Sequence, residues 1–393
     1  MQYSYVALLR LWCDSMEDTR LIATTRSGAG ERPDLGAEPS GLSRRAVLRG
    51  AAAAVTVLHA PRILIAAEPR RLRVSTFGGY FERMFAEHVH SAFTKATGIQ
   101  VQSIEQSEGA QFLFQLAEAN KSGKPPMDVC CAGAIDALRG RALGLWRTLN
   151  PARIPNLSQL PARFIGHGPT GIDGIGAMSW YMTLVVSSSD LKPLPDSWAV
   201  LWGKHPNAWG VMTGSQSPIF EIAANLYFGG NEVLTHKQGI DAVIGKIAEL
   251  KGNVKLWWQD EGTMQTALTN EDVVGGTYMH DTAIVMTRNG TPVRSIFPKE
   301  GAVSNTNYWC QPSASVKVAE AEEFISFCCT PEAQELIARH VGSAPVLERS
   351  KLRLSDQEFA AVSVSTPQID TATEVRFKFT DYMEQQFTRM VTS

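Results

Sequence analysis

The stretch GGTYMHDTAIVMTRNGTPVRSIFPKEGAVSNTNYW, residues 275–309, decides how the chain is divided. A polar turn at 278–281 leads into the apolar run 282–287, whose β-branched residues predict a buried strand. An Asn-Gly turn separates it from a second expected strand, 293–297, and the Pro-Lys-Glu-Gly of 298–301 ends that pair. We expect this stretch to form one wall of a ligand cleft and then to return the chain from a second lobe to the first.

Length and composition favour a globular protein of two domains. The chain has 393 residues, of which 44% are hydrophobic and 19% charged, enough for each of two domains to bury its own core. The net charge of −2 gives no electrostatic reason to expect a nucleic-acid partner.

Residues 1–67 are expected to be a leader rather than part of the fold. Ser43-Arg44-Arg45-Ala46-Val47-Leu48-Arg49 precedes an apolar run, 50–67, that has no acidic residue, which is the layout of a secretory signal. The paired arginines resemble the twin-arginine export signal. A membrane anchor is the alternative, but His59, Pro61 and Arg62 interrupt the run before it reaches the roughly 18 apolar residues of a span. We therefore expect cleavage near Ala67 and a periplasmic protein.

Six cysteines, at 13, 130, 131, 310, 328 and 329, include two vicinal pairs. There is no Cys-x-x-Cys and no histidine at zinc-finger spacing, so neither a metal nor another cofactor is expected. Burial as small apolar side chains is the simplest interpretation, and a disulfide between the two pairs is the alternative.

Expected strands and helices alternate along the rest of the chain, which indicates an α/β layered sheet. The strands are expected at 72–77, 99–104, 127–131, 182–187, 209–212 and 253–258. The helices are expected at 81–97 (closed by Gly98), 111–122, after 132–134, and at 218–227, 239–250, 262–268, 319–329 and 331–341. Residues 148–176, rich in proline and glycine, are expected to form a surface loop. The final fifty residues are expected to be helical, with Phe377, Tyr382 and Phe387 as packing contacts.

Several motifs, in order, carry a resemblance to a known family. Phe93 to Val101 (FTKATGIQV) is similar to F-x-K-x-T-G-I-x-V, and Ser197 to Trp202 (SWAVLW) to S-W-A-D-L-W. The Pro-Lys-Glu-Gly of 298–301 follows, then a segment from Phe324 that resembles F-I-x-F-x-x-x-P-E-A-Q, and the G-x-x-P of 342–345. Together these motifs resemble the solute-binding proteins of ABC importers, in the spermidine/putrescine-binding branch.

The resemblance implies a two-lobed type II periplasmic-binding-protein fold, with a mixed sheet flanked by helices in each lobe and a hinge between them. Lobe 1 would comprise 68–183 and 303–345, lobe 2 residues 184–302, and a C-terminal helical segment, 346–393, would pack on both. Such a protein is expected to be a monomer that delivers a small solute to permease subunits in the inner membrane.

The ligand chemistry departs from the polyamine branch. Polyamine capture needs carboxylates at amine spacing with aromatic faces between them. Where the branch has an acidic residue after its first strand, this chain has Gly78-Gly79. The branch also has a Trp-x-Asp motif after Pro-Lys-Glu-Gly, and this motif falls at about Asn305 and Asn307 of this chain. Asp260, Glu261 and Asp281 are candidate replacements. The first loop, Ser-Thr-Phe-Gly-Gly-Tyr, resembles a subgroup with varied ligands.

Residues beyond the carboxyl ends of strands, and on the return crossing, are the expected ligand contacts. These are Phe77, Gly78, Gly79, Tyr80, Gly133, Ala134, Thr213, Ser215, Trp258, Gln259, Tyr278, His280, Asp281, Asn305 and Asn307. Simpler interpretations stay open: Phe77 and Tyr80 could pack within lobe 1, only one of Trp257 and Trp258 can face the cleft because they lie on opposite faces of a strand, and His280-Asp281 could be an ordinary turn. Trp198 and Trp202 are expected to be packing residues.

Two other functions remain possible. An enzyme on the same fold would have to use Cys130 or Cys131 as its nucleophile, and a catalytic thiol needs a nearby base. No such signature occurs in the sequence, so no catalytic residue is expected. The second is a binding protein that is coupled to a sensor instead of a permease. Its sequence would have the same features as that of a transport protein.

Overall fold

The computed structural model describes residues 70–107, 109–187, 191–364 and 368–393. Of Tyr80 and Ala110 only the backbone is described. The expected leader and its twin-arginine motif lie outside the described residues. These described residues form one compact unit.

The first third of the described chain alternates strands and helices, as expected. Its elements are β1 (Arg71–Phe77), α2 (Tyr80–Met84), α3 (Ser91–Thr97), β2 (Gln100–Gln106), α4 (Gly109–Lys121), β3 (Val129–Gly133) and α5 (Ala134–Ala142). A π-helical segment, Phe85–His90, joins α2 to α3. Gly98 ends α3 with φ 74°, a left-handed conformation that suits glycine. β1 pairs in parallel with both β2 and β3, so the carboxyl ends of these strands share one edge.

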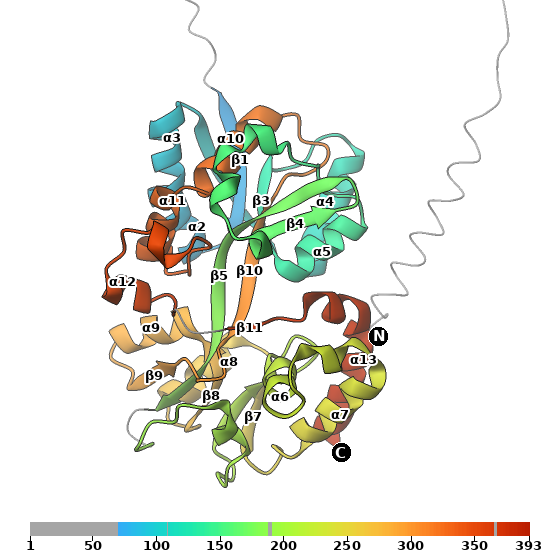
Figure 1. The fold of residues 1–393 in the computed structure, drawn as a ribbon, viewed down its shortest axis with the longest axis vertical. Coiled ribbons are helices and arrows are strands. Elements are labelled where there is room, and N and C mark those ends of the chain that lie inside the picture. The colour runs from blue at the N-terminus through green and yellow to red at the C-terminus, as the bar shows by residue number, and fades with distance from the viewer. Residues whose placement is uncertain (1–69, 108, 188–190, 365–367) are drawn as a thin grey trace, which may run out of the picture. The chain divides into compact units, whose positions relative to one another are not determined.

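Two long antiparallel strands connect the two halves of the described unit (Figure 1). They are β5 (Gly171–Ser187) and β10 (Val303–Cys310), and β4 (Ile165–Gly168) folds back on the start of β5. β10 pairs with β3 at one end, and β5 pairs with β8 and β9 at the other. One hydrogen-bonded series of strands therefore runs through both halves.

The second half contains another α/β unit. Its elements are β6 (Trp209–Met212), α6 (Ile219–Tyr227), α7 (Lys237–Ala248), β7 (Val254–Trp258), α8 (Glu261–Thr269), β8 (Gly275–Met279), α9 (His280–Arg288) and β9 (Val293–Ile296). Asp260 caps α8 by accepting a hydrogen bond from the backbone N–H of Thr263. β6 pairs in parallel with β7 and β8, which again brings the carboxyl ends of strands together.

The chain after β10 returns to the first half and then crosses once more. α10 (Val318–Cys328), α11 (Pro331–Leu336) and α12 (Asp356–Ala360) are followed by the short β11 (Ile369–Asp370) and by α13 (Thr373–Thr392). β11 pairs with the start of β10. The final fifty residues are therefore only partly helical, because 344–355 hold only a single 3-10 turn and β11 precedes α13.

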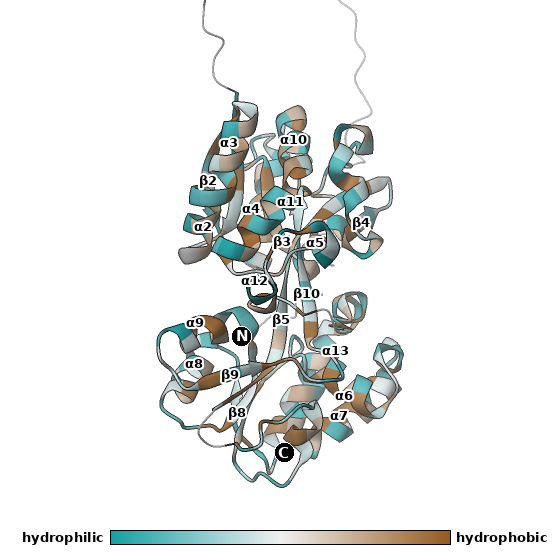
Figure 2. Ribbon diagram, turned by 60° about the vertical axis from the view of Figure 1, so that its left-hand side comes forward, coloured by the Kyte–Doolittle hydropathy of each residue, from teal (hydrophilic) through white to brown (hydrophobic). Residues whose placement is uncertain are grey.

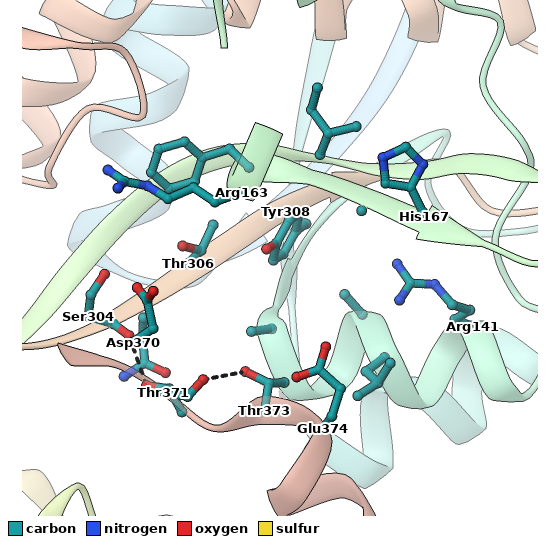
Figure 3. A pocket seen from close by; sticks show the side chains of 17 residues that line it. Arg141, Arg163, His167, Ser304, Thr306, Tyr308, Asp370, Thr371, Thr373 and Glu374 are labelled. Carbon is teal, nitrogen blue, oxygen red and sulfur yellow. Dashed lines mark hydrogen bonds between the residues drawn. The ribbon is translucent and has the colours of Figure 1, made fainter. Parts of the chain in front are cut away.

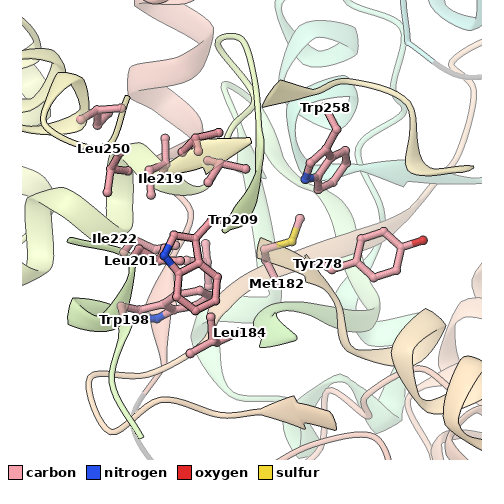
Figure 4. Close-up of a cluster of buried hydrophobic side chains, with 14 of the residues drawn as sticks. Met182, Leu184, Trp198, Leu201, Trp209, Ile219, Ile222, Leu250, Trp258 and Tyr278 are labelled. Atoms are coloured by element: carbon pink, nitrogen blue, oxygen red, sulfur yellow. The ribbon is translucent and has the colours of Figure 1, made fainter. Parts of the chain in front are cut away.

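Two separate hydrophobic cores define the two lobes. The core of lobe 1 contains Val74, Phe93, Ile175, Phe324 and Leu354, among others. The core of lobe 2 includes Trp198, Trp209, Trp258 and Tyr278 (Figure 4), together with Phe387 of α13. The C-terminal segment thus supplies buried side chains to both cores. Phe387 is buried as expected, but Phe377 is 39% exposed, so its expected packing role is wrong.

The run 282–287 is a helix, which contradicts the expected strand. Ala283 and Met286 are buried whereas Val285 is 47% exposed, a spacing that fits a helical period and not a strand's alternation. Asp281 in the first turn and Arg288 in the last complement the helix dipole. Figure 2 shows hydrophilic and hydrophobic residues together on α9. The buried strand of this stretch is β8, which ends just before the run.

The expected surface loop 148–176 is also partly wrong. It contains β4 and the start of β5, which is buried over most of its length. Glycines make this pairing possible because the strand lies very close to its neighbours. A Cβ at Gly176 would lie 2.8 Å from the Cβ of Phe164.

Candidate functional site

A cavity of about 200 Å³ lies where the two lobes meet the connecting strands, and we call it the interlobe pocket. Its lining residues come from strand ends in both lobes, from β5 and β10, and from the C-terminal segment. They are Gly133, Ala134, Ile135, Trp180, Met182, Met212, Gln216, Pro218, Met279, Asn305, Thr306, Asn307, Thr371, Thr373 and Arg376.

The strand ends reach this pocket because of the sheet order. β3 ends at Gly133, and the first turn of α5 follows with Ala134 and Ile135. In lobe 2, β6 ends at Met212 and β8 at Met279. Loops beyond the carboxyl ends of parallel strands are the usual ligand positions of α/β sheets. The pocket therefore has the location expected of a binding site.

The wall formed by the connecting strands carries amides and an aromatic ring. Asn305 pairs with Trp180, and Asn307 pairs with Met178 on one side and Gly133 on the other. Because side chains alternate along a strand, Asn305 and Asn307 face the same side of β10. Asn307 as a whole residue is 6% exposed, and no hydrogen bond joins its side chain to any of the described residues.

A buried ion pair fixes the loop that follows β6. Arg376 of α13 donates from Nε to Glu221 Oε1 (2.9 Å) and from its two Nη atoms to the carbonyl oxygens of Ser215 (2.7 Å) and Ser217 (3.0 Å). Arg376 is 3% exposed and Glu221 is fully buried. Glu384, which follows Arg376 on α13, accepts a hydrogen bond from the backbone N–H of Ser215 (2.7 Å). The C-terminal helix therefore holds this part of the pocket wall in place.

A second cavity of about 420 Å³ adjoins the first, and we call it the adjoining cavity. It shares Ala134, Asn305, Thr306, Thr371 and Thr373 with the interlobe pocket.

The adjoining cavity differs from the interlobe pocket in having several charged side chains on its wall. Figure 3 shows Asp370, Glu374 and Tyr308 on its wall, together with Arg141, Arg163 and His167. Arg141 is engaged with Asp173 through two hydrogen bonds of 2.7 and 2.8 Å. Burial raises the pKa of Tyr308, and the nearby Cys310 and Glu374 add to the effect. The carboxylates of Asp370 and Glu374 form no ion pair with the described residues.

Four of the sequence-predicted contacts line the interlobe pocket, namely Gly133, Ala134, Asn305 and Asn307. In the first loop, Phe77, Gly78 and Gly79 do not line it. Phe77 packs on Phe81 with ring centroids 5.5 Å apart, and a Cβ on Gly78 would collide with the side chain of Glu105. Gly79 begins α2 with φ 72°, and the Tyr80 side chain lies outside the described part of the chain.

The remaining predicted residues of lobe 2 are not among those that line the pocket. Ser215 is buried and Thr213 is half-buried in the loop that Arg376 holds, and Gln259 is exposed. Trp258 and Tyr278 are 1% and 0% exposed in the lobe 2 core, with ring centroids 5.8 Å apart. Trp198 is fully buried and donates its indole N–H to the Gly301 carbonyl (2.8 Å), which confirms its expected packing role.

His280 lies at the start of α9 and is 4% exposed. A carbonyl can only accept, so its Nε2 donates to Ala361 O (2.9 Å) and its Nδ1 accepts from Ser295 Oγ (2.9 Å). Burial lowers its pKa to about 4. This side chain is a structural link between α9 and the segment after α12.

Asp281 lines a third cavity, of about 540 Å³, between α9 and residues 338–342 and 358–362. Burial raises its pKa to about 6, although the backbone N–H of Thr282 donates to it. Glu261, which also raises this pKa, accepts a hydrogen bond from the Thr282 hydroxyl (2.8 Å). These acids form a cluster separate from the interlobe pocket.

The cysteines of the described chain are all buried and free. The expected burial is confirmed, and the alternative disulfide between the vicinal pairs is absent among these residues. Burial raises the pKa of Cys130 and of Cys131 well above the usual thiol value, so both stay protonated and are poor nucleophiles. Among the described residues no group of three or more His, Cys, Asp or Glu could hold a metal ion.

Sequence reasoning missed several lining residues. Gln216 and Pro218 belong to the loop from which Thr213 and Ser215 were chosen, and only the turn geometry decides which of them face the pocket. Thr371, Thr373 and Arg376 had no recognisable signal. They reach the pocket because β11 pairs with β10, a contact between segments more than 60 residues apart in sequence.

Comparisons with known proteins agree with this architecture. A spermidine/putrescine-binding periplasmic protein of Escherichia coli K12 is 23% identical over 265 residues, covering 66% of this chain and 74% of that protein. A substrate-binding protein of an ABC transporter from Bradyrhizobium japonicum superimposes with a TM-score of 0.70 at 18% identity, over 82% of this chain and 99% of its own. A GABA receptor superimposes with a TM-score of 0.67 at 18% identity, over 82% and 98% of the two chains.

The expected two-lobed periplasmic-binding-protein-like fold of type II is confirmed by these structural neighbours. No helix in the described part of the chain is long and apolar enough to span a bilayer. The model of one family matches residues 88–369. The chain belongs to the bacterial extracellular solute-binding proteins, which bind small solutes and deliver them to ABC permeases.

Proposed function

We propose that this protein captures a small, polar, amine-bearing solute between its lobes and delivers it to the permease of an ABC importer. The observation that carries the proposal is the interlobe pocket, because it is lined by strand ends of both lobes and by both connecting strands. A ligand there contacts both halves of the molecule, so its binding favours a closed arrangement of the lobes.

The amine is proposed from the charges beside the pocket. Asp370 and Glu374 lie on the wall of the adjoining cavity, where carboxylates stabilise an ammonium group. The Escherichia coli relative is a polyamine-binding protein, which supports the same class of ligand. The carboxylates expected of a polyamine site are, however, absent from the described lining of the interlobe pocket, so an amine other than a long polyamine fits better.

The location and the lobe boundaries are part of the proposal. The Escherichia coli relative is periplasmic, and the signal-like 43–67 of this chain supports export, with the paired arginines favouring the twin-arginine route. We retain 68–183 plus 303–345 as lobe 1 and 184–302 as lobe 2. The C-terminal segment, 346–393, is proposed to bind both, since its side chains enter both cores. We propose a monomer.

A ligand screen on the full chain tests the proposal. Spermidine, putrescine, amino acids, opine-like compounds and phosphonates are each added, and the thermal midpoint is measured. One amine-bearing class should raise it, because a ligand at 100 times its Kd stabilises a protein by about 2.7 kcal/mol. Absence of any shift with every amine would contradict the proposed solute class.

A pocket-filling variant supplies the control for this screen. Ala134→Trp places a large ring where both cavities meet, so the ligand-induced shift should disappear. Ala152→Trp adds the same ring at an exposed position and should leave the shift unchanged. An enzymatic role would instead require Cys130 or Cys131, and Cys131→Ala should leave the bound solute chemically intact and its affinity unaltered.

A further inference from the structure

We infer that the solute is zwitterionic, with a carboxylate bound in the interlobe pocket at Asn307 and the first turn of α5, and an ammonium bound by Asp370 and Glu374 in the adjoining cavity. This inference rests on the proposed function and narrows its solute class to amino acids whose two charged groups are separated along a chain.

The first observation is the Asn307 side chain. Asn307 as a whole residue is 94% buried and lines the interlobe pocket, and its side chain forms no hydrogen bond with the described residues. The atoms of this amide are not sealed in the core without a partner but open to the pocket, so a ligand there can supply the hydrogen bonds that the protein leaves unmade. The NH₂ group of the amide can donate to a carboxylate oxygen.

The second observation is the start of α5, which also lines the pocket. Gly133 is its N-cap and offers no side chain to the free N–H groups of the first turn. A Cβ on Gly133 would lie 3.9 Å from Asn307 Oδ1, so the amide and this helix start are adjacent. Backbone N–H groups at a helix start favour an anion.

The charges around α5 leave this position open to an anion. Asp136, in the same turn, accepts at Oδ2 from the backbone N–H of Gly109 (3.1 Å), and its Oδ1 lies 3.6 Å from Arg139 Nη1, so Arg139 partly offsets its charge. Arg376, the one ion among the described lining residues of the interlobe pocket, is engaged with Glu221. None of those lining residues is a carboxylate, so the pocket lacks a partner for an ammonium.

The third observation is the pair of acids in the adjoining cavity. Of its two arginines, Arg141 is engaged with Asp173 and Arg163 lies over the Phe164 ring, 4.7 Å from its centroid. Asp370 and Glu374 are exposed to the cavity and lie within electrostatic reach of Tyr308, whose pKa they help to raise. The two cavities share Ala134, Asn305 and Thr306, so one ligand can occupy both. Donors at one end and carboxylates at the other match a molecule with the reverse charges.

A diamine fits this arrangement poorly. Asn307 could rotate to offer its carbonyl oxygen to a second ammonium, but the backbone N–H groups of α5 cannot change their role. A diamine would therefore place one positive charge against the positive end of a helix. A dicarboxylate would place one negative charge beside Asp370 and Glu374.

Three ligands of equal length separate these cases. Calorimetry on the full chain compares 4-aminobutanoate, 1,4-diaminobutane and butanedioate, with 3-aminopropanoate to 6-aminohexanoate as a length series. At least one amino acid of the series should bind about tenfold or more tightly than the diamine and the dicarboxylate, about 1.4 kcal/mol. Tighter binding of the diamine than of every amino acid overturns the inference but leaves the proposed amine-binding function intact. Binding of none of the amines overturns both.

Two substitutions test which residues bind the carboxylate of the ligand and which bind its ammonium group. Asn307→Asp replaces the amide donor by a negative charge and should weaken the amino acid by about tenfold or more while improving the diamine. Glu374→Gln should weaken the amino acid and leave a dicarboxylate unaffected or tighter. Asn270→Asp and Glu332→Gln make the same changes at exposed positions away from both cavities and should alter nothing.

Unchanged affinity for the amino acid in Asn307→Asp, with a normal thermal midpoint, would contradict the assignment of the carboxylate. If that variant fails to fold, Asn307→Ser keeps a smaller hydroxyl donor and should show a weaker loss in the same direction. The comparison of the three ligands on the unsubstituted chain tests the inference in either case.

Discussion

At the scale of single residues, His280 makes stability depend on pH in a defined direction. Its folded pKa of about 4 lies below the ordinary value of about 6.5. Protonation therefore favours the unfolded chain, and the stabilisation is fully present above pH 6.5 and is lost as the pH falls towards 4. Over this window we expect the wild type to lose about 3 kcal/mol more than His280→Gln, measured by urea unfolding without ligand.

The control for this prediction is His167→Gln, since His167 is exposed and its loss should leave the pH dependence unchanged. Asp281, whose folded pKa is raised to about 6, acts with the opposite sign, because its stabilisation is lost as the pH rises through 6. Asp281 is present in the wild type and in both histidine variants, so its contribution cancels when their losses of stability are compared. Equal losses in wild type and His280→Gln would show that His280 is not held neutral by the fold.

Single residues also show how far sequence can place a site. Asn305 and Asn307 could be predicted to line the cleft because they fall where the resembling branch has its Trp-x-Asp after Pro-Lys-Glu-Gly. The alternation of a strand then explains why both lie on one face. Trp258 could not be assigned, because either face of its strand was possible until the packing around Tyr278 was known. Asp370 and Glu374 gave no signal, since only the pairing of β11 with β10 brings them to the cavity.

At the scale of elements, the run 282–287 shows why a local pattern can mislead. Ala-Ile-Val-Met has the β-branched content of a strand, yet it forms α9 because Ala283 and Met286 together cover the lobe 2 core. Tertiary packing here outweighs propensity. The glycine-rich start of β5 was missed for a related reason, because its partners β4 and β10 and not its composition make it a strand. Elements with a clear period, such as β1, α6 and α7, were predicted within a few residues.

Substitutions in α9 test the helix against the strand. Met286 is 2% exposed and Val285 is 47% exposed. We expect Met286→Ala to destabilise the protein by about 2–5 kcal/mol because it leaves a core cavity, whereas Val285→Ala should change stability by about 0.5 kcal/mol or less. Urea midpoints measure both. A strand would place 283 and 285 on one buried face, so a large loss for Val285→Ala would contradict the helix.

At the scale of the whole molecule, the two cores are joined by three segments. β5 contributes Ile175 to the core of lobe 1 and Val185 to that of lobe 2. β10 supplies Trp309 and Val303 to the same two cores, and the C-terminal segment supplies Leu354 and Phe387. Each core therefore contains side chains from segments that also contribute side chains to the other core. The lobes should therefore unfold together.

Paired core substitutions test this coupling. Phe324→Ala in lobe 1 and Phe220→Ala in lobe 2 each remove a fully buried ring and should cost about 3–5 kcal/mol. Hydrogen exchange at increasing urea then reports β1 and β6 separately. We expect either substitution to lower the protection of both strands at the same urea concentration, because unfolding one core removes β5 and the C-terminal segment from the other. Phe377→Ala, at a 39% exposed position, should change neither strand. If Phe324→Ala lowered the protection of β1 alone, the lobes would be independent folding units joined by passive connections, and closure around a ligand would have to proceed without the shared strands transmitting stability between them.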